Sequence, residues 1–313
     1  MRVLYITGWC RSGSTVLGNV LAEAPGVVHV GELRFLWLNG VLGSGSNARC
    51  GCGLNHRECP FWSRVLEAVR PDGRTLDQHA ADVVAWQEAH RTRHTWRTLR
   101  DFPPVRNTAP VRNTAPVRNG QRDGWPATLA ATYRAIAEVC GAHTVVDSSK
   151  YASDAALLSS LPGIDASYVH LIRDPRAVAW SWMQPKAYTG HRSALNSTLH
   201  WAGFNLAAEA VGRTHRADAL HLRYEDLVRN PCDAVGDILK LIGHDGPNPV
   251  AADGTVELGG NHTVTGNPNR FGRGRTLIRE DRRWHTDLPR PQRAATTLLA
   301  LPLLRRYGYE TKV

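Results

Sequence analysis

The strand, loop and helix expected at the start of the chain constrain its fold more than any other feature. Residues 3–7 form an apolar run that leads into the glycine-rich stretch GWCRSGST at positions 8–15, and residues 16–24 continue with a helical pattern. This order is the context in which the nucleotide-binding P-loop, G-x-x-x-x-G-K-[ST], occurs. Ser14, however, stands where that motif has its lysine. Because the lysine reaches the outer phosphates of a nucleotide, we expect this loop to hold an anion of lower charge, without a metal ion.

The loop itself offers groups that bind anions. Arg11 supplies a cation, and Ser12, Ser14 and Thr15 supply hydroxyl groups. The start of the following helix adds free backbone N–H groups and the positive end of the helix dipole. The loop therefore predicts an anion site, with a purely structural glycine turn between strand and helix as the alternative.

Strand-like and helix-like segments alternate along most of the chain. Short apolar runs at 27–30, 144–146, 167–172 and 220–222 predict strands, and helical patterns occur at 127–140 and from about residues 151, 175 and 194. Alternation of this kind predicts parallel pairing through right-handed crossovers. We therefore expect an α/β fold with a central parallel sheet flanked by helices. Residues 79–99 are expected to form one surface helix.

Length and internal repetition bound the domain organisation. The 313 residues suit one large α/β domain that spans 1–313, with insertions at about 40–60 and at 103–120. The second insertion contains PVRNTA twice and PVRN once, and each unit opens with proline, which disfavours helix interiors and central strands. We expect a flexible, basic surface loop there, with a binding arm as the alternative.

The balance of charges indicates an anionic ligand or partner. Lys and Arg number 38 against 28 Asp and Glu, a net charge of +10, although a solvated basic surface would give the same count. Aromatic residues are not interleaved with the basic repeat, so nucleic acid is not an expected partner. The chain opens with MRVLYITG rather than a leader, and no apolar run approaches the roughly 20 residues of a membrane span. We therefore expect a cytoplasmic protein without a membrane span, whose six cysteines are thiols.

Two segments resemble the donor-binding motifs of sulfotransferases that use 3′-phosphoadenosine-5′-phosphosulfate (PAPS). The order RSGST, in which Gly13 is central, resembles the loop that holds the 5′-phosphosulfate. It is most similar to the branch of carbohydrate and protein-tyrosine sulfotransferases, which has arginine where the cytosolic branch has lysine. In LIRDPRAVAWSW, Arg173 and Ser181 have the spacing of the family's 3′-phosphate site, an arginine at a strand end and a serine eight positions later. The bidentate guanidinium of arginine suits a phosphate there.

Two further segments resemble the family in the same order along the chain. RYEDLVRNP at 223–231 is similar to the strand and turn that bring a tyrosine near the adenine, which would be Tyr224 here. GNPNRFGRGR at 266–275 resembles the C-terminal loop that closes over the 3′-phosphate, and it offers Arg270, Arg273 and Arg275. Val16 departs from the cytosolic branch, which has tryptophan against the adenine at this position. That stacking must come from elsewhere.

The resemblance also implies the catalytic groups. Glu32, in HVGELRF, stands where the tyrosine-sulfating branch carries its catalytic base, and an ion pair with Arg34 is the alternative. Lys150, in VVDSSK, ends a strand from which family members place a lysine on the transferring sulfuryl group, and Arg11 would assist it. Asp147 would orient Lys150 or the acceptor, or residues 147–149 would cap the next helix.

Histidines and cysteines near these segments offer other chemistry. His29, His170, His200 and His262 are alternative bases, although His170 lies within a strand and is expected to be packed. Cys10 would have a lowered pKa at the helix start. The segment CGCGLNHREC contains ligand types for zinc, but its C-x-C spacing is tighter than C-x-x-C and no fourth cysteine lies close by. We favour a substrate-side loop with reduced thiols and expect no metal; the residues concerned are Cys50, Cys52, His56 and Cys59.

The expected function is a sulfotransferase that moves a sulfuryl group from PAPS, without a metal, to a hydroxyl of a small-molecule, glycoside or glycolipid acceptor. Two alternatives stay open. A P-loop small-molecule kinase would need magnesium and a cation for the outer phosphates. A non-enzymatic polyanion-binding protein would rest on the net charge and the PVRNTA repeat alone.

Overall fold

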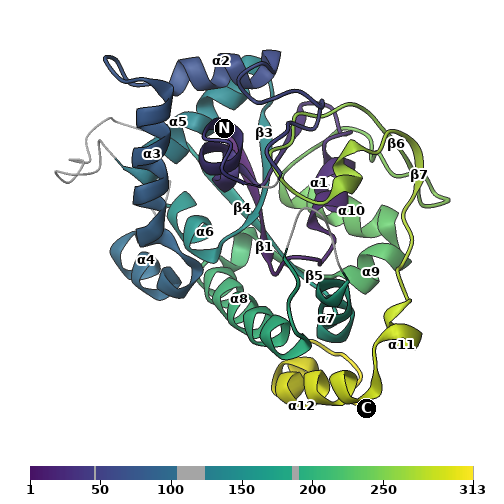
Figure 1. Ribbon diagram of the computed structural model, residues 1–313. Coiled ribbons are helices and arrows are strands. Elements are labelled where there is room, and N and C mark those ends of the chain that lie inside the picture. The colour runs from purple at the N-terminus through teal and green to yellow at the C-terminus, as the bar shows by residue number, and fades with distance from the viewer. Residues whose placement is uncertain (46, 104–123, 185–189, 313) are drawn as a thin grey trace.

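A five-stranded parallel sheet forms the centre of the computed structural model, which describes residues 1–45, 47–103, 124–184 and 190–312 (Figure 1). Its strand order is β2-β3-β1-β4-β5. The strands are β1 (Arg2–Gly8), β2 (Val27–Gly31), β3 (Thr144–Lys150), β4 (Asp165–Ile172) and β5 (Ala219–Arg223). The expected central parallel sheet is confirmed. The PVRNTA repeat at 104–119 lies outside the described residues, so the expectation for that loop is not tested.

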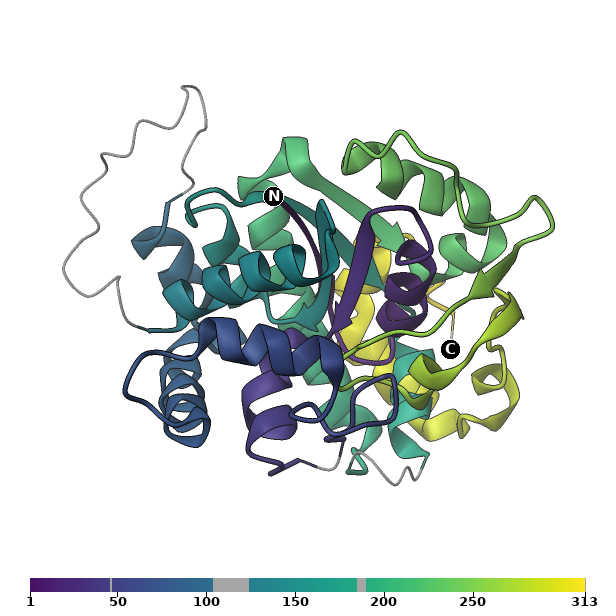
Figure 2. The same ribbon diagram turned by 90° about the horizontal axis from the view of Figure 1, so that it is seen from above.

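Alternating side chains along β1 give the sheet two apolar faces. Val3 and Tyr5 face a cluster built on α2 (Pro60–Val69), α5 (Trp125–Cys140) and α6 (Ala152–Leu158). Leu4 and Ile6 face the opposite cluster, with α1 (Ser14–Leu21) and α10 (Pro231–Leu241). Successive residues of a strand point to opposite faces, so a continuous apolar run is typical of a strand buried on both sides. Helices therefore cover both faces of the sheet, as Figure 2 shows from above.

A third apolar cluster lies beyond the carboxyl ends of β1 and β4. Trp9 joins Trp182 and Trp201 there, and these residues pack α7 (Pro175–Met183) and α8 (Ala194–Thr214) against α12 (Arg290–Arg306). Further elements are α9 (Tyr224–Arg229), the short α11 (Trp284–Asp287), and an antiparallel pair, β6 (Thr255–Leu258) and β7 (Gly274–Leu277). Within the described residues, no helix combines the length and apolar character that crossing a bilayer requires.

Residues 79–99 do not form the single helix that the sequence predicts. They divide between α3 (Leu76–Gln87) and α4 (Thr95–Asp101), which short 3₁₀ turns connect. The backbone carbonyl of Gln87 accepts a hydrogen bond from Arg34 Nη2 (2.5 Å), and the Gln87 side chain donates to the Arg34 carbonyl (3.0 Å). The carbonyl of the last residue of α3, which has no partner within the helix, is thus satisfied by a distant arginine.

Strand order brings the predicted functional segments to one edge of the sheet. β1 lies between β3 and β4, so the order of the strands reverses there, and ligands of open α/β sheets gather at such a point. The loop 9–13 follows β1 and Glu32 follows β2, while Lys150 ends β3 and Arg173 follows β4. β3 runs four residues further than predicted, to Lys150 itself. The parallel arrangement therefore places these four segments at the same carboxyl edge.

Candidate active site

Left-handed backbone conformations shape the loop between β1 and α1. Gly8, Arg11 and Gly13 have φ angles of 124°, 74° and 91°. A Cβ atom at Gly13 would lie 2.7 Å from the ring of Tyr224, so glycine is needed for that ring to approach the loop. Gly13 is also the N-cap of α1 and has no side chain to cap its first turn. That turn therefore keeps backbone N–H groups for a bound anion.

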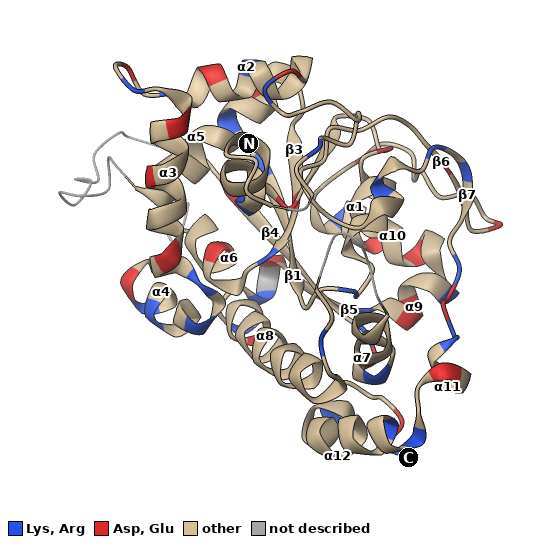
Figure 3. Ribbon diagram, viewed as in Figure 1, with Lys and Arg blue, Asp and Glu red and all other residues tan. Residues whose placement is uncertain are grey.

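A cavity of about 1150 Å³ opens at this edge of the sheet. Among the described residues that line it, Lys150 and eight arginines outnumber three acidic residues, Glu32, Glu88 and Asp281. Over the whole molecule, Lys and Arg are spread across most elements, with Asp and Glu between them on helices such as α3 and α9 (Figure 3). The cavity therefore concentrates positive charge, which suits an anionic ligand. Its arginines are Arg11, Arg34, Arg91, Arg93, Arg173, Arg192, Arg279 and Arg283.

The predicted phosphate-binding residues Arg173 and Ser181 both line this cavity. The Arg173 guanidinium lies 4.4 Å from the centre of the Tyr224 ring and donates to the backbone carbonyls of Arg11 (3.1 Å) and Asp281 (3.2 Å). Its Nε is buried without a hydrogen-bond partner among the described residues. A buried donor without a partner is costly, so an anion that accepts from Arg173 would complete its hydrogen bonding.

The predicted loop residues divide between the cavity and the interior. Arg11, Gly13, Ser14 and Thr15 line the cavity. The Thr15 hydroxyl oxygen also accepts from the backbone N–H of Asn267 (3.3 Å), which connects the loop to the C-terminal part of the chain. Ser12 does not line the cavity; it is buried, and its hydroxyl has no partner among the described residues.

Glu32 and Lys150 form an ion pair at the cavity, with 2.7 Å between Oε1 and Nζ. Lys150 Nζ also donates to the backbone carbonyl of Ser148 (2.7 Å). Burial alone would lower the pKa of the Lys150 ammonium, but the neighbouring Glu32 carboxylate outweighs it and raises that pKa above the ordinary value. Lys150 is therefore charged at neutral pH. The alternative ion pair between Glu32 and Arg34 is wrong, because Arg34 Nη1 bonds both carboxylate oxygens of Asp154 (2.7 and 2.8 Å).

Asp147 supports this pair from outside the cavity. Its carboxylate accepts from the Tyr133 hydroxyl (2.6 Å) and from the backbone N–H (2.7 Å) and hydroxyl (2.5 Å) of Ser149. Burial raises the pKa of Asp147 to about 6. The alternative of a helix cap from residues 147–149 is wrong, since the N-cap of α6 is Tyr151 and no side chain caps it. Asp147 therefore fixes the backbone at the end of β3, next to Lys150.

Tyr224 lies at the start of α9, against the phosphate loop. Its hydroxyl donates to the backbone carbonyl of Arg279 over 3.5 Å. Apolar side chains from α1, α9, the end of β7 and the residue after it line the cavity as well: Val16, Leu227, Val228, Leu277 and Ile278. Together with the Tyr224 ring they form a wall that suits a planar, apolar group such as a nucleobase.

The glycine-rich segment after residue 265 places its arginines differently from the prediction. Arg270 is fully buried, and its guanidinium donates to the backbone carbonyls of Thr263 (2.7 Å) and Arg49 (2.7 Å). Arg273 lies against Gly260, and neither arginine lines the cavity. The arginines from this part of the chain that do line it are Arg279 and Arg283. No motif marks these two in the sequence, because they follow the glycine-rich stretch in an ordinary charged run, IREDRR.

Aromatic side chains that the sequence analysis did not single out form another part of the lining. Trp9, in the phosphate loop, contacts Trp182, His200 and Phe204, with ring centres 5.9, 5.3 and 4.4 Å away. The Arg11 guanidinium lies 4.7 Å from the centre of the Trp182 ring. The only signal in the sequence was adjacency, since Trp9 belongs to the loop and Trp182 follows Ser181.

The other candidate bases and the loop cysteine lie in different surroundings. Burial lowers the pKa of His29 and of His170 to about 3, so both rings are neutral; His29 bonds Asn19, and His170 bonds Asn205 as a packed side chain. His200 lines the cavity, whereas His262 lies among cysteines. Burial raises the pKa of Cys10, in contrast to the expected decrease. All six cysteines lie in described parts of the chain and are free thiols.

Comparison with known proteins agrees with this geometry. Residues 4–247 match the family model described as the Sulfotransferase family. The fold is similar to the sulfotransferase domain of the olefin synthase from Synechococcus PCC 7002, with a TM-score of 0.52 and 21% identity over 99% of this chain and 95% of that one. It is also similar to the sulfotransferase domain from the curacin biosynthetic pathway, with a TM-score of 0.51 and 16% identity over 98% and 97% of the two chains. No curated protein sequence matches the chain.

Proposed function

The chain belongs to the sulfotransferase family, and from that premise we propose that it transfers a sulfuryl group from PAPS to a hydroxyl group of a small-molecule, glycoside or glycolipid acceptor. Family membership decides against the two alternatives that the sequence left open, a small-molecule kinase and a non-enzymatic polyanion-binding protein. One observation carries the proposal further: an anion-binding loop, a buried arginine with an unpartnered Nε and a Glu–Lys ion pair meet in one positively charged cavity.

The donor would lie along the loop between β1 and α1. The N–H groups at the start of α1, with Arg11, Ser14 and Thr15, would hold the 5′-phosphosulfate. Arg173 and Ser181 would hold the 3′-phosphate, and Arg279 and Arg283, which line the same cavity, would be its further ligands. The wall around Tyr224 would hold the adenine in place of the tryptophan that Val16 replaces.

The two members of the ion pair, Glu32 and Lys150, would have different roles in the transfer. Glu32 takes the proton of the acceptor hydroxyl while the acceptor oxygen forms a bond to sulfur. The bond between sulfur and the 5′-phosphate oxygen breaks, and adenosine 3′,5′-bisphosphate leaves with the bonding electrons. Lys150 and Arg11 stabilise the negative charge that grows on the sulfuryl and bridging oxygens. Because Lys150 contacts Glu32 directly, proton acceptance and charge stabilisation occur at one point of the cavity.

The aromatic part of the cavity supports an uncharged or weakly charged acceptor. Trp9, Trp182 and Phe204 present rings there, and ring faces pack well against sugar C–H groups and phenolic rings. Incubation with ³⁵S-labelled PAPS and a panel of glycosides, phenols and glycolipids tests the proposal. We expect labelled product without added magnesium. Absence of transfer to every acceptor class, together with absence of slow donor hydrolysis, would contradict it.

Replacing Arg173 with alanine is expected to weaken the binding of adenosine 3′,5′-bisphosphate. Loss of one charge-assisted contact costs about 1.5–3 kcal/mol, which is about 10–150-fold in Kd. The rate of the bound complex should change less, because the 3′-phosphate lies away from the bond that breaks. Isothermal titration calorimetry measures the effect, with Arg275→Ala as the matched control, since Arg275 is exposed and pairs with Asp253 outside the cavity. Equal affinity in wild type and Arg173→Ala would remove Arg173 from the donor site.

A second pair of variants compares the C-terminal arginines. Arg279→Ala is expected to weaken adenosine 3′,5′-bisphosphate binding by about tenfold or more, because one charge-assisted hydrogen bond is lost. Arg273→Ala should leave the affinity close to that of the wild type, since Arg273 does not line the cavity. Isothermal titration calorimetry with adenosine 3′,5′-bisphosphate measures both affinities. The reverse pattern would return the 3′-phosphate to the glycine-rich segment.

A further inference from the structure

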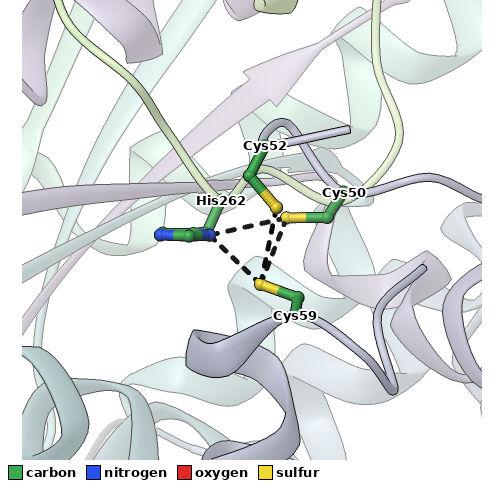
Figure 4. A group of neighbouring side chains, drawn as sticks. All are labelled: Cys50, Cys52, Cys59 and His262. Atoms are coloured by element: carbon green, nitrogen blue, oxygen red, sulfur yellow. Dashed lines mark hydrogen bonds between the residues drawn. The ribbon is translucent and has the colours of Figure 1, made fainter. Parts of the chain in front are cut away.

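Four metal-binding side chains meet at a point that the proposed reaction does not use. Cys50, Cys52, Cys59 and His262 bring their ligand atoms within 4.8 Å of one another. Figure 4 shows one ring nitrogen of His262 facing the three sulfur atoms and the other pointing away from them. None of the four residues lines the cavity. The cluster is therefore separate from the donor and acceptor sites.

Four of the six distances between ligand atoms in the cluster are close to the edges of a tetrahedron around zinc. Zn–S bonds of about 2.3 Å at tetrahedral angles place two sulfur atoms about 3.8 Å apart, and a sulfur and a nitrogen about 3.6 Å apart. Cys59 Sγ lies 3.7 Å from the Sγ atoms of both Cys50 and Cys52. His262 Nδ1 lies 3.7 Å from Cys50 Sγ and 3.2 Å from Cys59 Sγ. Three thiols and an imidazole that converge at this spacing form a Cys₃His donor set.

The backbone around the cysteines supports metal-bound thiolates. Cys50 and Cys52 lie in a tight turn closed by a bridge between Arg49 and Asn55, and Cys59 is the N-cap of α2. The backbone N–H groups of Phe61 and Trp62 lie near the Cys59 sulfur, and that of Leu54 lies near the Cys52 sulfur, so they are placed to donate to thiolates. Hydrogen bonds of this kind orient and stabilise sulfur ligands.

The fourth ligand is a residue that the local sequence does not provide. His56, which lies within the cysteine segment, turns its Nδ1 to the backbone carbonyl of Ala48 (2.8 Å) and stays out of the cluster. His262 comes from 203 positions after Cys59 and reaches the cluster because Gly51 donates to the backbone carbonyl of Thr263 (3.0 Å). A Cβ atom at Gly51 would lie 1.9 Å from Asn261 Oδ1, so glycine allows this approach.

We propose that Cys50, Cys52, Cys59 and His262 hold one zinc ion in a closed, structural site. Four protein ligands leave no open position for a water or a substrate, which distinguishes such a site from a catalytic one. The ion would fasten the turn at 49–55 to the segment 261–267. Thr265, Gly266 and Asn267 of that segment line the cavity, and Asn267 donates to Thr15 in the phosphate loop. Zinc would thus hold one wall of the donor cavity in place.

Metal analysis of the full-length protein tests the proposal. Purified under reducing conditions without chelator, the wild type should contain about one zinc per chain by mass spectrometry. After removal of the metal, Co²⁺ should restore one equivalent with the visible d–d bands and the thiolate charge-transfer bands of a tetrahedral cysteine site. This measurement on the wild type does not depend on the folding of any variant.

Matched variants identify the ligands. Cys59→Ser and His262→Asn should lose the zinc and lower the melting temperature, whereas Cys232→Ser and His56→Asn, which change a cysteine and a histidine outside the cluster, should keep the zinc. His262→Cys should retain a metal with four sulfur ligands. Failure of the reduced wild type to take up Zn²⁺ or Co²⁺ would overturn the proposal, as would one zinc per chain in Cys59→Ser or His262→Asn. Metal content and melting temperature are measured without PAPS, so failure here leaves the proposed transfer untouched.

Discussion

Replacement of Glu32 by glutamine is expected to lower turnover about 10²–10⁴-fold, the usual effect of losing a general base. Glutamine keeps the size of the side chain and an oxygen that accepts from Lys150, but it removes the group that takes the acceptor proton. Affinity for adenosine 3′,5′-bisphosphate should stay close to that of the wild type, because Glu32 acts on the acceptor. Single-turnover transfer of ³⁵S from saturating labelled PAPS measures the rate, and calorimetry measures the affinity.

Two other carboxyl variants test whether the loss of turnover is specific to Glu32. Glu138→Gln, on the exposed surface of α5, should have wild-type turnover. Asp147→Asn should lower turnover less than Glu32→Gln, because Asp147 does not line the cavity and acts only through the end of β3. If Glu32→Gln kept near-full activity while Asp147→Asn or His200→Ala abolished it, the base would be misassigned, although the family would still stand.

Replacement of Lys150 by methionine is the second change with a large expected effect. Methionine fills a similar volume without a charge, so the growing negative charge on the sulfuryl group loses its nearest buried cation. Removal of one such electrostatic contact lowers kcat by about 10²–10³-fold. Adenosine 3′,5′-bisphosphate carries no sulfuryl group, so its affinity should change little. The same single-turnover and calorimetric measurements separate the two effects.

The ion pair supplies a further check on Lys150. Lys240→Met is the matched control, because Lys240 is exposed on α10 and pairs with Asp237 away from the cavity. The double variant Glu32→Gln, Lys150→Met should lose much less than the product of the two single losses, since residues that act as one unit are not additive. Independent, multiplicative losses would show that the two residues do not work together, and a wild-type rate in Lys150→Met would remove it from the reaction.

Features that depend on short stretches of chain were predictable from the sequence. The five strands are short apolar runs between helical segments, and each pattern is local. The positions of Glu32, Lys150 and Arg173 at one edge followed as well, because the carboxyl ends of parallel strands meet there. Which side chains pair across long stretches of sequence could not be predicted in the same way. The sequence left Glu32 with Arg34 as a possible partner, whereas the fold brings it to Lys150, 118 positions away.

The remaining differences also arise from tertiary contacts. α3 ends at Gln87, where buried Arg34 donates to the backbone carbonyl, and helical periodicity does not reveal such a contact. Arg270 stands in a glycine-rich stretch typical of an exposed loop, yet it is fully buried and bonds backbone carbonyls. His262 joins three cysteines across more than 200 residues, whereas the sequence offered the neighbouring His56 as the histidine of such a set. The sequence shows which side chains are present, but the tertiary fold determines which of them come into contact.

Binding of adenosine 3′,5′-bisphosphate, compared with binding of ATP and magnesium, tests the donor assignment most directly. A loop without the P-loop lysine, together with a separate arginine site at Arg173, suits a nucleotide with a 5′-group of low charge and a 3′-phosphate. Calorimetry with the wild-type protein should show saturable binding of the bisphosphate at one site without magnesium, at least about tenfold tighter than any binding of Mg²⁺–ATP. Tight binding of Mg²⁺–ATP with none of the bisphosphate would contradict the account.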